Sequence, residues 1–317
     1  MLEPATALFE LASGLLKTGN ALFEPAIGLL ETGRAAFRPC PKTPRWPKRP
    51  QIASLQQVMN PLANRRVNET LTGLGQITLL ARDAFASLLR LRMAWHDVLF
   101  QMYFIGVKSQ TVVLITGAFT GMVLGAQTYF QFHKIKMDTA SLAVVGVSMC
   151  SELGPVLTAL MVAGRVGGAM AAEIGTMRVT EQIDALRALA THPVDYLVVP
   201  RLVASHLVLP LLTVEAIVVG IGAGYLVGVC LLGIDPTYLW YNMLHFTHDV
   251  DVMIGLTKAF IFGGIIALVG CYKGMTCGLG AQGVGRATME AVVYASISIL
   301  ITNFFLTLLM GKLVGQL

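Results

Sequence analysis

The sequence predicts an all-α integral membrane protein with five transmembrane helices, an interfacial amphipathic helix before them, and a short charged helix on the cytoplasmic side. Of its 317 residues 55% are hydrophobic and only 13% are charged, and the mean hydropathy is +0.68. Too few polar side chains remain to cover a soluble globule of this size. Five apolar stretches reach the roughly 20 residues that cross a bilayer: Val107 to Phe130, Ala143 to Ala172, Leu202 to Leu232, Val252 to Cys271 and Ala291 to Met310.

Residues 1–50 form an N-terminal segment with a heptad pattern and a Pro/basic linker. Leucine recurs every seventh position from Leu8 to Leu29, which gives a narrow apolar seam. We favour a helix on the inner membrane surface, and a partner-binding seam is the alternative. The prolines from Pro41 to Pro50 recur every third residue among basic residues, as in a stiff polyproline linker.

Residues 51–106 form the second region, and residues 107–317 form the five-helix domain. From about Asn68 to Trp95, leucines return at helical spacing with arginines on other faces. This pattern predicts an interfacial helix that leads into the first span.

Basic residues predict how the spans are oriented. Lysines and arginines are frequent before the first span and recur after the second, whereas the connection from Gly233 to Asp251 has none. Because basic loops stay in the cytoplasm, we expect a cytoplasmic N-terminus and an external C-terminus.

Rows of small residues predict close helix packing. Three rows repeat at intervals of four residues, and such rows let helix backbones approach each other in a membrane. We expect a tight bundle, with a second copy of the chain as a further packing partner. The rows are Gly117, Gly121 and Gly125; Gly220, Gly224 and Gly228; and Ala159, Ala163, Gly167, Ala171 and Gly175.

Glu152, Arg165 and Glu215 are charged residues inside predicted spans. A charge at such depth costs at least about 2.5 kcal/mol and needs a partner or a wet cavity. We expect Arg165 and Glu215 to form a structural ion pair. Glu152 has no basic neighbour at helical spacing in its own span and precedes Pro155, which weakens a helix. It is a candidate for lining a cavity or for a proton or cation relay.

After the second span, a short charged helix is predicted. Thr180 is a candidate cap, Glu181 and Asp184 fall in the first turn, and Arg187 lies nearer the other end. An apolar side formed by Ile183, Leu186 and Leu189 favours docking to a cytoplasmic protein.

The central motif resembles a known family. The run S-E-L-G-P-V-L-T-A-L-x-x-A-G-R-x-G-x-A-x-x-A-E-I-G-T-M-x-x-T-E-Q-I-D-A-L begins at Ser151, and P-x-x-Y-L-V-x-P-R ends at Arg201. Together with GIDP from Gly233 and GVGRAT from Gly283, it resembles the MlaE/YrbE-type permeases of ABC phospholipid transporters, which are associated with MCE proteins and related to the chloroplast lipid permease. The resemblance covers about Asn68 to the C-terminus.

The resemblance implies a homodimeric permease subunit, not an enzyme, that moves glycerophospholipid between membranes and serves outer-membrane lipid asymmetry. It implies a multi-pass protein of the bacterial inner membrane. The implied partners are a cytoplasmic ABC ATPase that binds ATP and Mg, an MCE-domain substrate-binding protein and an accessory STAS-domain protein. We expect no cofactor on this chain and no nucleic acid.

The resemblance also places two groups of site residues. The expected lipid pathway includes Glu152, Ser151, Pro155, Leu124 and Gln127. Some members of the family have arginine immediately before the glutamate, where this chain has Ser151. The expected ATPase-coupling residues are Glu173, Met177, Arg178, Thr180, Glu181, Gln182, Asp184 and Arg187.

Other motifs carry weaker signals. Gly278, Gly280 and Gly283 spell GxGxxG without a preceding strand, and Gly280 to Gly285 lacks the lysine of a Walker A loop. The histidines and acids between His245 and Asp251 favour a solvated loop over a metal site. Two other functions stay open: an ion- or proton-coupled secondary transporter that uses Glu152 and Glu215, and a non-transporting membrane scaffold.

Overall fold

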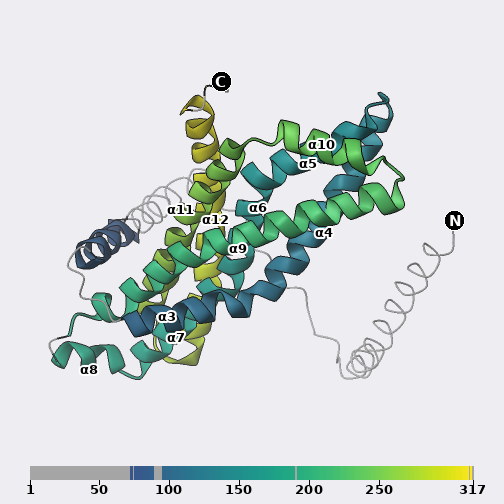
Figure 1. Ribbon diagram of the computed structural model, residues 1–317. Coiled ribbons are helices and arrows are strands. Elements are labelled where there is room, and N and C mark those ends of the chain that lie inside the picture. The colour runs from purple at the N-terminus through teal and green to yellow at the C-terminus, as the bar shows by residue number, and fades with distance from the viewer. Residues whose placement is uncertain (1–71, 74, 89–94, 190, 314, 316–317) are drawn as a thin grey trace, which may run out of the picture. The chain divides into compact units, whose positions relative to one another are not determined.

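The computed structural model describes residues 72–73, 75–88, 95–189, 191–313 and 315, all within the compact unit Asn64–Leu317. These residues form helices and turns, with no strand among them. Five helical segments are long and apolar enough to cross a membrane, which confirms the predicted class (Figure 1). They are Trp95–His133, Asp138–Val179, Val194–Leu231, Asp249–Met275 and Gly280–Leu313. The heptad and proline patterns of residues 1–50 lie outside the described residues.

The first span is a broken helix that starts earlier than predicted. It consists of α3 (Trp95–Ile105) and α4 (Val107–His133), which meet at Gly106. Residues 95–106, assigned from the sequence to the preceding region, are thus continuous with the first span. The predicted helix before it is helical at residues 72–73 and 75–88, and its place at a membrane surface stays a prediction.

Two of the predicted small-residue rows face each other within the chain. α4 packs along α9 (Val199–Leu226), and a Cβ added at Gly121 would lie 1.9 Å from the Gly220 carbonyl oxygen. At Gly117 the added Cβ would lie 3.0 Å from the Ala216 oxygen. Because any side chain at Gly121 would separate the two backbones, glycine is what permits this close seam.

The second span contains two π-turns. α5 (Ser141–Ser148) follows the short turn η2 (Asp138–Ala140), and then come η3 (Met149–Leu153), α6 (Gly154–Val162), η4 (Ala163–Gly167) and α7 (Gly168–Val179). Its small-residue row packs on α11 (Asp249–Met275), where added Cβ atoms at Gly270 and Gly274 would lie 3.1 and 3.0 Å from the oxygens of Gly167 and Ala171.

The remaining elements complete the bundle. The third span starts with η5 (Val194–Val198), continues as α9 and ends in η6 (Val227–Leu231), and α10 (Pro236–Phe246) connects it to α11. The Asp235 carboxylate caps α10 by accepting from the Thr237 N–H at 2.9 Å. The fifth span, α12 (Gly280–Leu313), is the least buried of the five.

The bundle has two distinct ends. α8 (Gln182–Ala188) lies at one end beside α7, whereas α10 and the C-terminus lie at the other (Figure 1). We call these the α8 end and the α10 end. At the α8 end, the helix at residues 75–88 contributes Leu80 and Ala84 to an apolar cluster with Ile174 and Ile183.

Candidate functional site

Glu152 lies on the π-turn η3, which Pro155 helps to create. In a regular α-helix the Ser151 carbonyl would accept from the N–H of residue 155, but proline has no N–H. The chain widens here, and the Gly154 N–H bonds to the Met149 oxygen five residues back. The Ser151 carbonyl is therefore available to another donor.

That donor is Lys258 of α11. Its ammonium group donates to the Ser151 oxygen at 3.1 Å, to Glu152 Oε1 at 2.5 Å and to the Thr307 hydroxyl at 2.9 Å. The Lys258 side chain is 0% exposed, so all three donors of the ammonium are satisfied inside the bundle. The ion pair and the two hydrogen bonds offset part of the cost of burying this cation.

α12 completes the binding of Glu152. The Thr307 hydroxyl donates to Glu152 Oε1 at 2.8 Å, and the Asn303 amide donates to Oε2 at 3.1 Å. The glutamate side chain nevertheless remains 36% exposed. Asn303 Oδ1 is buried and has no hydrogen-bond partner among the described residues. We call Glu152, Lys258, Asn303 and Thr307 the Glu152 cluster; it pairs its charges and leaves one acceptor unused.

Gly255 brings α11 close to the π-turn. A Cβ at this position would lie 2.0 Å from the Cys150 carbonyl oxygen and 3.2 Å from the Pro155 ring. Lys258 follows one helical turn later, so this close backbone approach lets its ammonium reach the Ser151 carbonyl.

Of the other residues of the predicted lipid pathway, Ser151 is joined to the Glu152 cluster through its carbonyl, which accepts from Lys258. The Ser151 hydroxyl donates to the Val147 oxygen at 2.7 Å, and Pro155 is buried. Leu124 packs against an apolar cluster at the α10 end, and Gln127 is exposed. The role of these residues in a lipid pathway stays a prediction.

The predicted ion pair between Arg165 and Glu215 is wrong. Arg165 donates to the Ser109 hydroxyl at 2.6 Å, and Glu215 accepts from the Gln110 amide at 2.8 Å. Both charged residues therefore use adjacent polar side chains of α4. Arg165 lies on the π-turn η4, whose extra residue rotates it away from the face expected of a regular helix.

The segment after the second span forms α8, as expected for a short charged helix. Glu181 precedes α8 with a positive φ of 60°, and Glu181, Gln182, Asp184 and Arg187 are all exposed. Thr180, predicted as the cap of α8, instead ends α7 and donates to the Thr176 oxygen at 2.9 Å. The left-handed conformation of Glu181 separates the end of α7 from the start of α8.

Most of the apolar side of α8 contacts the chain itself. Ile183 is buried, and Leu186 packs partly against the same cluster, whereas Leu189 is 76% exposed. The expectation that this side is available to a partner is therefore corrected. The exposed surface of α8 is its polar face, where Arg187 and Asp184 pair at 3.0 Å.

The predicted coupling residues on α7 tie the end of that helix to its neighbours. Glu173 forms an ion pair at 2.9 Å with Arg201, whose side chain is 4% exposed. Arg178 donates to the Met275 carbonyl at the end of α11, and Met177 packs partly against the apolar cluster. These contacts connect the end of α7 to α9 and α11.

Three residues of the Glu152 cluster are not among the residues predicted from the sequence. Lys258, Asn303 and Thr307 were not singled out, although a lysine inside an apolar span was a visible signal. Among the described residues no group of three or more His, Cys, Asp or Glu side chains could hold a metal, and His248 instead caps α11 together with Asp251.

Known proteins resemble the chain over most of this structure. Residues 98–309 match the family model described as Permease MlaE. A probable ABC transporter permease protein of Rickettsia felis is 44% identical over 238 residues, which cover 75% of this chain and 92% of the relative. The intermembrane phospholipid transport system permease protein MlaE of Haemophilus influenzae is 37% identical over 66% of this chain and 81% of its own length. The chloroplastic protein TRIGALACTOSYLDIACYLGLYCEROL 1 of Arabidopsis thaliana is 35% identical over 73% of this chain and 66% of its own length.

Proposed function

The chain belongs to the MlaE permease family, and we propose that it moves glycerophospholipid between membranes when a separate cytoplasmic ATPase hydrolyses ATP. It is an ABC transporter permease subunit and a multi-pass inner membrane protein. The relatives in Haemophilus and Rickettsia carry permease names, and the Haemophilus name specifies intermembrane phospholipid transport. In this proposal ATP and Mg bind to the partner ATPase, and this chain has no catalytic residue.

The observation that carries the phospholipid proposal is the Glu152 cluster. The partly exposed Glu152 carboxylate and the buried, unused Asn303 oxygen are two acceptors beside each other between membrane-spanning helices. A headgroup with a primary ammonium or hydroxyl groups has donors for both, and acyl chains fit the apolar surroundings. The π-turn beside Pro155 gives the helix a weak point at the same place.

The exposed polar face of α8 supports the coupling proposal. Its exposed acids and Arg187 are available to charged groups on a soluble partner, while Ile183 holds the helix to the bundle. Movement of α8 passes through α7 to the contacts of Glu173 and Arg178. A rigid transmission of this kind fits a transporter driven by domain motion.

The proposed assembly follows the family. α12 exposes an apolar surface along its length, including Ile297, Phe304 and Leu308, which suits lipid or a second copy of the chain. We propose that two copies of the chain form a homodimer through this surface. The complex also contains an MCE-domain protein and an accessory STAS-domain protein. The N-terminus lies in the cytoplasm, on the same side of the membrane as α8.

Copurification tests the assembly. The full chain is purified in mild detergent, and proteins and lipids are identified by mass spectrometry. The proposal expects an ABC ATPase and bound phospholipid. A lipid-poor monomer without a partner contradicts it, and gradient-driven transport by the chain alone would favour the secondary-transporter alternative.

Charge reversal tests the docking face. Glu181→Lys combined with Asp184→Lys should abolish association with the ATPase while the membrane fold and its melting temperature stay intact. Asp249→Lys, an exposed acid at the start of α11, is the control and should keep the ATPase. Retention of the ATPase by the double variant refutes the assignment of this face.

A further inference from the structure

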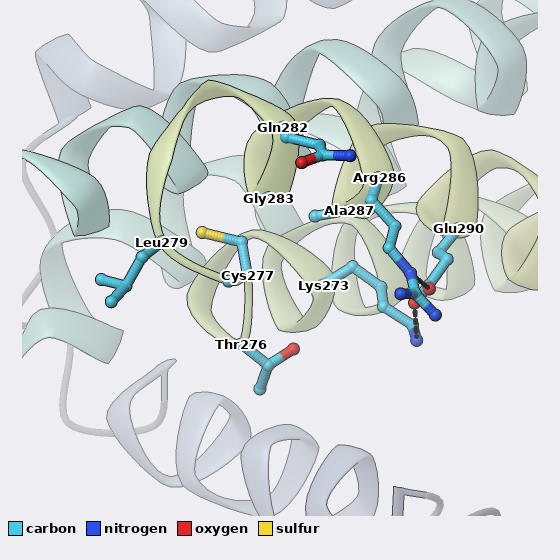
Figure 2. Close-up of a pocket in the computed structure, with 10 residues that line it drawn as sticks. Lys273, Thr276, Cys277, Leu279, Gln282, Gly283, Arg286, Ala287 and Glu290 are labelled. Atoms are coloured by element: carbon cyan, nitrogen blue, oxygen red, sulfur yellow. Dashed lines mark hydrogen bonds and ion pairs between the residues drawn. The ribbon is translucent and has the colours of Figure 1, made fainter.

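A second polar site lies where α11 turns into α12, at the α8 end. A half-open cavity of about 500 Å³ is lined mainly by polar groups, among them Lys273, Gln282, Arg286 and Glu290 (Figure 2). It is separate from the Glu152 cluster, whose Lys258 lies near the other end of α11. The proposed transport cycle gives this cavity no role.

Two cations share one carboxylate in the wall of this cavity. Glu290 accepts from Lys273 Nζ at 2.9 Å and from Arg286 Nε at 2.9 Å, as the dashed lines in Figure 2 show. Lys273 is further fixed over the Tyr294 ring, 4.0 Å from its centroid. The three side chains together therefore leave one positive charge uncompensated.

Arg286 presents that charge in a form that can bind an anion. Only its Nε is used by Glu290, and its two terminal amino groups have no hydrogen-bond acceptor within the described part of the chain. The side chain is 83% exposed. Because a guanidinium group donates two parallel hydrogen bonds to a phosphate, this fork is a suitable phosphate ligand.

The turn below Arg286 leaves room for such a group. Gly280 has a positive φ of 76°, and a Cβ at Gly283 would lie 2.3 Å from the Gly278 carbonyl oxygen, so the turn closes without side chains at these positions. The first N–H groups of α12 begin here and lack acceptors within the helix. They add a second source of positive potential beside the two cations.

Apolar groups next to the cavity favour a lipid over a soluble anion. Leu279, which lines the cavity, is 92% exposed, and Met289 on the following turns of α12 is 71% exposed. Both lie at the end of membrane-spanning helices, where headgroups meet acyl chains. A soluble phosphate would make no favourable contact with these exposed apolar side chains.

We propose that the cavity binds the phosphate of an anionic phospholipid from the leaflet on the α8 side. Arg286 and the start of α12 hold the phosphate, Lys273 adds charge, and Leu279 lies against the lipid chains. The cavity is also tied to α7, because Cys277 donates to the Gly175 oxygen and Arg178 donates to the Met275 oxygen. A bound lipid would thus stabilise the junction that leads into α8.

Lipid titration monitored by native mass spectrometry tests the proposal. The delipidated full chain is titrated with phosphatidylglycerol and, separately, with phosphatidylcholine of the same acyl chains. We expect a preference for phosphatidylglycerol that Arg286→Gln lowers about tenfold, as for the loss of a charge-assisted hydrogen bond. The matched control Lys312→Gln removes a cation from the other end of α12 and should keep the preference. The proposal is overturned if Arg286→Gln and Lys312→Gln show the same preference for phosphatidylglycerol.

Two further arms distinguish the ligand source and the electrostatic argument. Glu290→Gln removes the competing carboxylate and should raise the affinity for phosphatidylglycerol severalfold, whereas a fall would show that the trio is only structural. Millimolar glycerol 3-phosphate should not displace the lipid; displacement would overturn the lipid assignment in favour of a soluble phosphate. The role of the Glu152 cluster is tested separately by ATP-dependent lipid transfer, so the two proposals fail separately.

Discussion

Two lysines of α11 have different surroundings: Lys258 lies inside the bundle, and Lys273 lies in the last turn of the helix. Lys258 is 0% exposed, and its three donors end on the Ser151 oxygen, Glu152 and Thr307. Lys273 is 18% exposed and shares the Glu290 carboxylate with Arg286. One lysine is enclosed and neutralised, and the other belongs to a group with an excess of positive charge.

The difference shows how this fold uses charge. Inside the bundle an unpaired charge is too costly, so Lys258 is tolerated only with a glutamate and polar groups of α12 around it. At the edge, water and headgroups can compensate, so Arg286 keeps donors available. We therefore expect the Glu152 cluster to contribute to stability and transport. We expect Lys273, Arg286 and Glu290 to contribute to lipid binding at the surface.

The largest expected effect comes from breaking the enclosed pair. Lys258→Ala leaves Glu152 without its cation in a mostly apolar bundle and should lower the free energy of unfolding by about 3–5 kcal/mol. Lys273→Ala is the matched change in the last turn of α11. It should cost below about 1 kcal/mol, because the Glu290 carboxylate still pairs with Arg286 and contacts solvent. Unfolding in mixed micelles measures both, and equal losses would remove the distinction between the two lysines.

The next effect concerns the backbone approach that positions Lys258. Gly255→Ala places a Cβ against the Cys150 carbonyl, and the helices must separate, at a cost of about 2 kcal/mol. Gly285→Ala is the control, because a Cβ there meets nothing within 4 Å, and it should change stability by below about 0.5 kcal/mol. A neutral result for Gly255→Ala would show that the approach of α11 to the π-turn is not needed.

The smallest effect concerns one hydroxyl. Thr307→Val removes a hydrogen bond to each member of the buried ion pair and should cost about 1.5 kcal/mol. Thr276→Val, which removes only a bond to the Tyr272 carbonyl at an exposed helix end, should cost less. The difference between the two melting temperatures is the measurement, and a larger loss for Thr276→Val would contradict this account of the cluster.

Local patterns in the sequence predicted much of the fold. The five spans follow from length and hydropathy, and the rows through Gly121 and Gly220 predicted close packing because small residues repeat on one face. The sequence did not reveal that these two rows meet each other inside one chain. Which row packs against which depends on the arrangement of all the helices together.

The candidate site was harder to predict because its contacts join three separate helices. Glu152 was identified, but its partner Lys258 lies in another span, and Asn303 and Thr307 lie in a third. The wrong pairing of Arg165 with Glu215 has the same origin. A π-turn shifts the faces of a helix, and neither its place nor its effect follows from a regular 3.6-residue period.

In the proposed transport cycle, the Glu152 cluster contacts the transported headgroup. The most direct measurement is ATP-dependent transfer of labelled phospholipid from proteoliposomes that contain the complete complex, with Glu152→Gln combined with Lys258→Met. This double variant removes both charges together and keeps similar volume, so the fold and the bound ATPase should persist. We predict that ATP hydrolysis continues while lipid transfer is lost. Transfer at the wild-type rate would contradict the claim.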